Sequence, residues 1–215
     1  MELSKTLIVL TAALPMLGAE YRVKHGTLSI DERGVSYQET GKNHQRHVSW
    51  SYQDIQQLEL SPARLRVLTY EGNRWKLGAD RSYTFDALAG QDFTDSYPLL
   101  KDRLDQRFVA ELADPAIQPL WSVPVELRGR FAGSQGVLTI GRDRIVYSTA
   151  RPGASRTWRH RDIDNIGTSG PFELTLTTFE RAIEHYGNRK DFNFRLKEPL
   201  DERRYNELWR TLHHE

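Results

Sequence analysis

The sequence contains no cysteine. Disulfides, thiolate nucleophiles, Cys-ligated metals and Fe–S clusters are therefore excluded. It also has no Asn-x-Ser/Thr sequon, P-loop, G-x-G-x-x-G or H-E-x-x-H motif. The net charge is only +1, so global electrostatics give no reason to expect nucleic-acid binding. We expect no cofactor, no metal and no nucleic-acid partner.

Catalytic motifs are equally scarce. The stretch AGSQG (132–136) approaches the G-x-S-x-G elbow of serine hydrolases, but Ala132 replaces the first glycine. The elbow also needs a following helix, whereas a strand is predicted here. His44 and His47 have no adjacent acidic partner, so KNHQRH (42–47) is interpreted as a solvated basic loop. We expect a protein that is not an enzyme, and keep an unrecognised enzyme class as the weakest hypothesis.

Long apolar runs are missing except at the start of the chain. Lys5 precedes a run of apolar character over 6–17, and Leu17-Gly18-Ala19 ends in a small residue. These are the parts of a secretory signal peptide, and the run is shorter than the roughly 20 residues of a transmembrane helix. We expect 1–19 to be an export signal and the protein to be extracytoplasmic, periplasmic or secreted. The alternatives are a buried first helix or an uncleaved anchor.

The chain repeats itself. GTLSIDERGVSY (26–37) matches GVLTIGRDRIVY (136–147), and WSYQDI (50–55) matches WRHRDI (158–163). LRVLTYE (65–71) likewise matches LTLTTFE (174–180). Because the matches keep their order, we interpret the chain as two copies of one structural unit.

Each unit shows strand-like alternation followed by a helical stripe. The predicted strands are 21–24, 27–30, 34–39, 47–52, 55–61, 64–71 and 82–87 in the first unit, and 125–131, 137–140, 144–149, 156–162, 165–169, 172–179 and 192–197 in the second. The helical stripes are Tyr97, Leu100, Leu104 and Phe108, and Tyr205, Leu208, Trp209 and Leu212. Ser96 and Asp201 are the expected N-caps.

The units are expected at 20–112 and 126–215, separated by a proline-rich linker at 113–125. Leu120, Trp121 and Val123 in the linker are too apolar to be left in water. We therefore expect Trp121 to be buried between the two units.

The repeated W-x-x-x-D-I phrase has a structural explanation. The tryptophan supplies apolar area to a strand face, and the isoleucine enters the core after the turn. The aspartate can accept backbone N–H bonds where the chain turns. We expect the same corner in both units rather than a shared catalytic role.

Seven strands and a closing helix in each unit resemble a pleckstrin-homology-like (PH-like) barrel. The sequence motifs are similar to those of the bacterial PH and GRAM type. The residues that carry the resemblance are Gly26–Ile30 with Trp50–Ile55, and Gly136–Ile140 with Trp158–Ile163. The resemblance implies a mainly β fold with α (α+β): two tandem PH-like seven-stranded β-barrels, each closed by a C-terminal α-helix.

The most suggestive cluster is RPGASRTWRHR (151–161). Its guanidinium groups could hold phosphate or carboxylate, and its tryptophan could meet a membrane interface. The alternative is an inward tryptophan with solvated arginines. The candidate ligand-binding residues are Arg151, Arg156, Trp158, Arg159 and Arg161.

Three functions stay open. The first is an exported binding or scaffold module that holds a protein or peptide along a sheet edge or beside a C-terminal helix. The second is recognition of an anionic membrane surface or phosphate headgroup by the 151–161 arginines. The third is the enzyme of unrecognised class. The oligomeric state does not follow from the sequence.

Overall fold

The protein is described from a computed structural model, over residues 18–40, 46–72, 80–129, 133–181 and 189–213. Most of the expected export signal, and part of the 42–47 loop and of the AGSQG stretch, lie outside these residues. The first unit contains β1 (Ala19–Val23), β2 (Gly26–Ile30), β3 (Gly34–Glu39), β4 (His47–Ser51), β5 (Ile55–Leu60), β6 (Arg64–Gly72), β7 (Asp80–Asp86), the 3-10 turn η1 (Phe93–Ser96) and α1 (Tyr97–Arg103).

A short strand, β8 (Phe108–Ala110), then leads to the second unit. This unit contains β9 (Pro119–Leu127), β10 (Ser134–Gly141), β11 (Arg144–Thr149), β12 (Arg156–Arg159), the 3-10 turn η2 (His160–Asp162), β13 (Ile163–Gly167), β14 (Glu173–Thr178), β15 (Lys190–Leu196) and α2 (Glu202–His213). The fold is mainly β with few helices, as expected for the α+β class, and the strand positions follow the predicted alternation closely.

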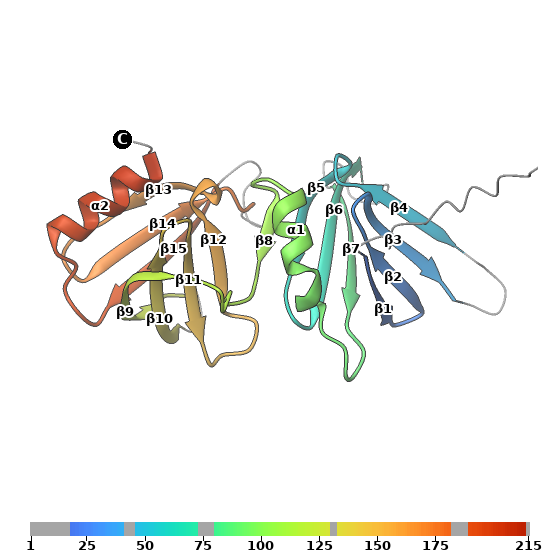
Figure 1. The fold of residues 1–215 in the computed structure, drawn as a ribbon, viewed down its shortest axis with the longest axis horizontal. Helices are drawn as coiled ribbons and strands as arrows, with labels where there is room; N and C mark the ends of the chain where they lie inside the picture. Colours follow the sequence, from blue (N-terminus) through green and yellow to red (C-terminus); the bar gives the residue numbers. More distant parts are fainter. Residues whose placement is uncertain (1–17, 41–45, 73–79, 130–132, 182–188, 214–215) are drawn as a thin grey trace, which may run out of the picture.

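The strands form two open sheets. One has the order β1-β2-β3-β4, and the other runs β13-β14-β15-β9-β10-β11-β12-β8-β5-β6-β7. The larger sheet therefore continues from one unit into the other, as Figure 1 shows. In the second unit β9 pairs directly with β15, whereas in the first unit an isolated bridge, Val23 to Ala87, makes the corresponding connection. The hydrogen-bonding ladders do not close into separate barrels.

Each unit has its own hydrophobic core. The first core gathers buried side chains from β1 to β8 and α1, including Leu28, Leu58 and Leu100. The second gathers them from β9 to β15 and α2, including Leu138, Leu176 and Leu208. The side chains at alternate strand positions point inward, as a half-buried strand requires.

The repeated glycines are required by close approach of the backbone. A Cβ on Gly26 would lie 2.2 Å from the carbonyl oxygen of Gln38. A Cβ on Gly136 would lie 2.3 Å from the carbonyl oxygen of Ser148. The same steric constraint therefore explains why both units have glycine at this position.

The structure confirms the interpretation of W-x-x-x-D-I. Trp50 and Trp158 are buried, as are the isoleucines that end the two phrases. Asp54 accepts from the backbone N–H of Ser51 at 3.2 Å, and Asp162 accepts from that of Arg159 at 2.8 Å. The phrase recurs because both corners are built in the same way.

The first helical stripe was predicted to extend too far. α1 ends at Arg103, and Phe108 lies in β8 rather than on the helix. β8 pairs in parallel with β5 and contacts β12 through one antiparallel bridge. Ser96 also does not cap α1 with its side chain; its hydroxyl lies 2.6 Å from that of Tyr21. Asp201, by contrast, caps α2 by accepting from the backbone N–H of Arg204 at 2.8 Å.

The second unit begins within the segment expected to be a linker. β9 starts at Pro119, a tolerated place because proline at the first residue of a strand removes no interior ladder bond. Trp121 is consequently not buried between the units, and that prediction was wrong. It is half-buried and packs on the second core. None of the described helices is both long and apolar enough to cross a membrane.

Candidate functional site

The arginines singled out in the sequence lie at the junction between the units. The guanidinium of Arg159 donates to the carbonyl oxygens of Leu104 at 2.8 Å and Asp105 at 2.6 Å, and also to that of Lys101. Arg161 donates to two of the same carbonyls, at 3.0 and 3.3 Å. These oxygens belong to the last turn of α1 and to the two residues that follow it, where helix carbonyls lack a partner within the helix. The two arginines therefore cap a helix of the other unit.

Arg159 is also paired within its own unit. It binds both carboxylate oxygens of Asp162, at 2.8 and 2.7 Å. Burial raises the pKa of Asp162, and the hydrogen bonds from Arg159 act in the opposite direction. The pair is thus a buried bidentate ion pair of the kind that depends on both partners.

The other candidate residues make intramolecular contacts as well. Arg156 pairs with Glu111 at 2.6 Å across the junction. Arg151 donates to the carbonyl oxygen of Gly133 at 3.3 Å. Trp158 is buried and donates its indole N–H to Glu180 at 2.9 Å, so it does not reach a membrane interface. The structure places these residues on β12 and in the segments just before and after it, and three of them contact β8, its neighbour Glu111 or the end of α1 rather than a shared open site.

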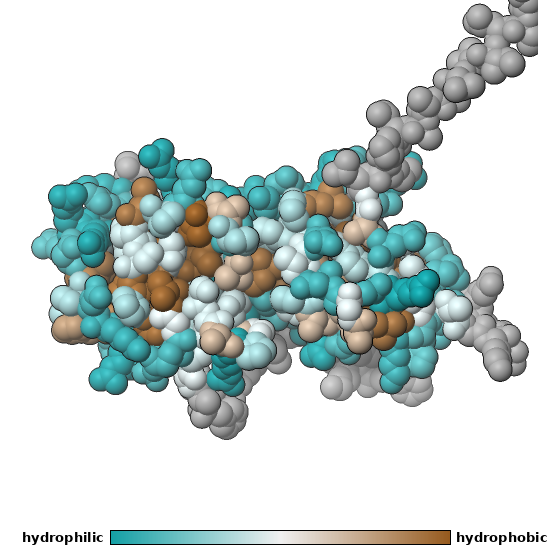
Figure 2. Space-filling model, turned by 60° about the horizontal axis from the view of Figure 1, so that its bottom comes forward, coloured by the Kyte–Doolittle hydropathy of each residue, from teal (hydrophilic) through white to brown (hydrophobic). Residues whose placement is uncertain are grey.

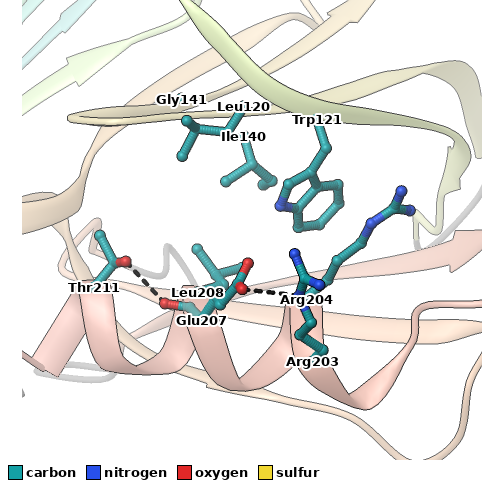
Figure 3. A pocket seen from close by; sticks show the side chains of 9 residues that line it. All are labelled: Leu120, Trp121, Ile140, Gly141, Arg203, Arg204, Glu207, Leu208 and Thr211. Atoms are coloured by element: carbon teal, nitrogen blue, oxygen red, sulfur yellow. Dashed lines mark hydrogen bonds and ion pairs between the residues drawn. The ribbon is translucent and has the colours of Figure 1, made fainter.

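A different surface offers an open site. Between α2 and the paired strands β9 and β10 lies a groove of about 360 Å³, which we call the α2 groove (Figure 3). Its lining residues are Leu120, Trp121, Ile140, Gly141, Arg203, Arg204, Glu207, Leu208 and Thr211.

A β-bulge builds the strand wall of the α2 groove. Ile140 pairs with Trp121 and Gly141 pairs with Pro119, so Leu120 is an extra residue without a partner in β10. Bulges re-aim side chains, and here both Leu120 and Trp121 line the groove. Leu120 keeps 55% of its surface exposed.

The helix wall is polar at its rim and apolar at its base. Leu208 is buried, and Figure 3 shows it on α2 beside Glu207, pointing toward the strands. The guanidinium of Arg204 lies 5.8 Å from the centre of the Trp121 ring. Arg203 pairs with Glu207 at 3.1 Å, with 85% of the arginine side chain exposed. An ion pair this exposed contributes little and can be exchanged for another.

One feature of the α2 groove could be recognised from the sequence. Leu120 and Trp121 were predicted to be too apolar to be left in water, and Trp121 to be buried between the units. Trp121 is instead half-buried against the second core, and Leu120 is 55% exposed. The roles of Arg203, Arg204 and Glu207 were missed, since a charged helix face is ordinarily solvated. Among the described residues, no group of three or more His, Asp or Glu side chains is placed to hold a metal ion.

Neither a protein-family model nor a curated protein matches the chain. Among solved structures, the chain is similar to the C-terminal domain of an unknown protein from Leishmania infantum, with 14% identity, a TM-score of 0.35 and coverage of 56% of this chain and 94% of that one. It is also similar to the Spt16D Pob3N heterodimer, with 11% identity, a TM-score of 0.30 and coverage of 86% and 98%. Likenesses this distant support no inference about this chain.

Proposed function

We propose that the protein is an exported, non-enzymatic binding or scaffold protein built from two tandem PH-like domains. Each domain comprises seven strands followed by a helix, in the order that the resemblance implies. The proposal assigns its partner to the protein or peptide class and its docking site to the α2 groove.

The observation that carries this proposal is the open apolar groove with a polar rim. Apolar contact area with a few convergent polar groups is typical of a recognition site, and a groove beside a helix is a known mode of peptide binding. Leu120, Val137 and Phe172 are exposed apolar side chains of the second unit. Figure 2 shows apolar side chains gathered on a face of this unit, with hydrophilic ones around them. Only Leu120 of the three lines the groove.

The contacts at the junction favour a protein partner over an anionic lipid. Arg156, Arg159 and Arg161 would have to leave Glu111 and the α1 carbonyls before they could bind a headgroup. Removing one partner from such a buried pair is strongly unfavourable. The lipid alternative therefore becomes an outcome of the test.

The test is selection from a displayed dodecapeptide library against the full chain, followed by binding measurements on three variants. Peptides that bind the wild type and Val137→Asp, but not Leu120→Asp, would support the α2 groove. Val137 is a matched control for Leu120 because both are exposed aliphatic residues on adjacent strands. Phe172→Asp serves as a second control from β14's border.

Two outcomes would overturn the proposal. One is a selection that enriches no peptide, or enriches peptides that bind Leu120→Asp equally well. The other is flotation of the wild type with anionic but not neutral vesicles, lost at high salt and in Arg156→Ala, with no peptide enriched. That result would assign the protein to the lipid-binding class instead.

A further inference from the structure

In the first unit, the surface that corresponds to the α2 groove is covered by the unit's own side chains. The two helices differ in length but can be aligned on one pair of residues, since Tyr97 and Leu100 match Tyr205 and Leu208 in spacing and type. Both leucines are buried in the core of their own unit. The helix position before each leucine can therefore be compared directly.

That position differs in chemistry. In the first unit it is Leu99, which is half-buried and packs on the first core. In the second unit it is Glu207, which is exposed and lines the α2 groove. The first helix thus supplies its own apolar side chain at this place, whereas α2 leaves the place open.

The charges beside the groove differ as well. In the first unit Arg103, one turn after Leu99, pairs with Glu32 at 3.2 Å. The corresponding residues of the second unit are Thr211 on the helix and Arg142 in the loop after β10. Arg142 is exposed and forms no ion pair with any described residue. The second unit therefore has the basic Arg142 where the first has the acidic Glu32. It has the neutral Thr211 where the first has the basic Arg103.

From these substitutions we infer that the partner's docking segment presents a leucine-like side chain flanked by carboxylates. The apolar side chain would take the place that Leu99 holds in the first unit, between Leu120, Trp121 and Leu208. The carboxylates would meet Arg203 and Arg142, as Glu32 meets Arg103. This inference rests on the proposed function and names the chemistry of the partner.

The electrostatics favour this assignment over a basic or neutral segment. At the rim Arg203 pairs with Glu207 and Arg204 pairs with Asp201 at 3.4 Å, while Arg142 follows directly after the lining residue Gly141 and adds a positive charge. A carboxylate can bind a guanidinium through two parallel hydrogen bonds. Arg203 pairs with Glu207, and both side chains are exposed. Replacing Glu207 by a carboxylate of the partner therefore costs little free energy.

The experiment uses synthetic fluorescein-labelled dodecapeptides with one central leucine. Four aspartates flank the leucine in one peptide, four asparagines in the second and four lysines in the third. Affinity for the full chain is measured by fluorescence anisotropy at low and high salt. We expect the aspartate peptide to bind at least about fivefold more tightly than the asparagine peptide, with the difference reduced at high salt.

Variants of the chain locate the effect. Arg203→Gln combined with Arg142→Gln is expected to remove the preference for aspartate, while Arg210→Gln keeps it. Arg210 is a matched control because it is an exposed arginine of the same helix that does not line the groove. A central Leu→Ala change in the peptide is expected to abolish binding.

The inference and the proposed function can fail separately. Groove-dependent binding that is equal for the three peptides, or a preference unchanged in Arg203→Gln/Arg142→Gln, would overturn the acidic partner and leave the proposed function intact. Binding of none of these peptides, together with no groove-dependent peptide from the display library, would overturn both.

Discussion

The two units share a strand order and differ in how their helices meet the sheet. In the first unit Leu99 packs on the core, and Arg103 pairs with Glu32. In the second unit Glu207 and Thr211 occupy the corresponding helix positions and line an open groove. The comparison shows that a few helix side chains decide whether this surface is closed, while the strands below it keep the same pattern.

The junction shows the same division of roles. Arg159 and Arg161 of the second unit cap the end of α1, whereas Ser51 and Gln53 stand at the corresponding positions of the first unit. The hydroxyl of Ser51 hydrogen-bonds within its own corner, 2.6 Å from Asp54. One copy of the corner therefore serves its own unit, and the other also joins the two units.

The largest effect is expected from breaking the junction corner. Arg159→Ala should lower the free energy of unfolding by about 3–5 kcal/mol, because it leaves Asp162 buried without its charge partner. Ser51→Ala, the matched change in the first unit, should lower it by about 1 kcal/mol or less. Denaturant unfolding of both variants measures the difference. Equal effects would contradict the assignment of a joining role to Arg159.

The next effect separates the two buried tryptophans. Trp158 donates to Glu180, while the buried indole N–H of Trp50 meets no hydrogen-bond partner among the described residues. Trp158→Phe should therefore be more destabilising than Trp50→Phe by about 1.5–3 kcal/mol, the net contribution of a hydrogen bond to a charged group. Thermal and denaturant unfolding provide the measurement. A larger loss for Trp50→Phe would show that volume, not the hydrogen bond, dominates.

A smaller effect should follow from converting one unit's surface into the other's. Glu207→Leu introduces the side chain that the first unit carries at Leu99. It should stabilise the protein by up to about 1 kcal/mol through apolar burial. It should also lower the affinity for peptides that bind in the groove at least about tenfold. Arg210→Leu adds the same side chain outside the groove, so it should leave peptide binding unchanged. Unaltered binding in Glu207→Leu would argue against the α2 groove as the docking site.

The smallest effect is a pH dependence at the junction. Burial raises the pKa of Glu111, with Arg156 acting in the opposite direction. A raised pKa in the folded state means stabilisation that is present at low pH and lost as pH rises through that pKa. The stability of the wild type relative to Glu111→Gln should therefore fall as the pH rises through the raised pKa of Glu111.

Asp143 should give a pH dependence of stability with the opposite sign. Hydrogen bonds from Arg144 lower its pKa, so its contribution is present at neutral pH and lost as pH falls. The stability of the wild type relative to Asp143→Asn should rise with pH, in contrast to the Glu111→Gln comparison. Matching slopes in the two series would show that the junction does not bury Glu111 as described.

The strands could be predicted from the sequence because alternation of apolar residues has a period of two. β8 could not, since three buried residues carry too short a pattern, and Phe108 happens to continue the helical spacing of Tyr97, Leu100 and Leu104. Its strand conformation depends on pairing with β5, which lies far away in the sequence. Tertiary contact therefore overrode local pattern at this point.

The candidate site was only partly predictable, for a related reason. The arginines of 151–161 could be recognised as a cluster, but the sequence does not reveal which carbonyls lie opposite them. Leu120 and Trp121 could be recognised as apolar, but the bulge that aims both toward α2 depends on the register of β9 against β10. Composition identified residues of interest, and long-range pairing determined what each one contacts.

The parallel pairing of β8 also gives the chain an order of assembly. During synthesis the first core can form once β8 has been made, but the C-terminal end of α1 remains uncapped until Arg159 and Arg161 follow. The junction therefore forms after the first core, and its contacts can open while that core stays folded. In hydrogen exchange, the amides that join β8 to β5 should accordingly report the stability of the first core, in which Phe108 and Ala110 are buried, rather than the docking of the second unit.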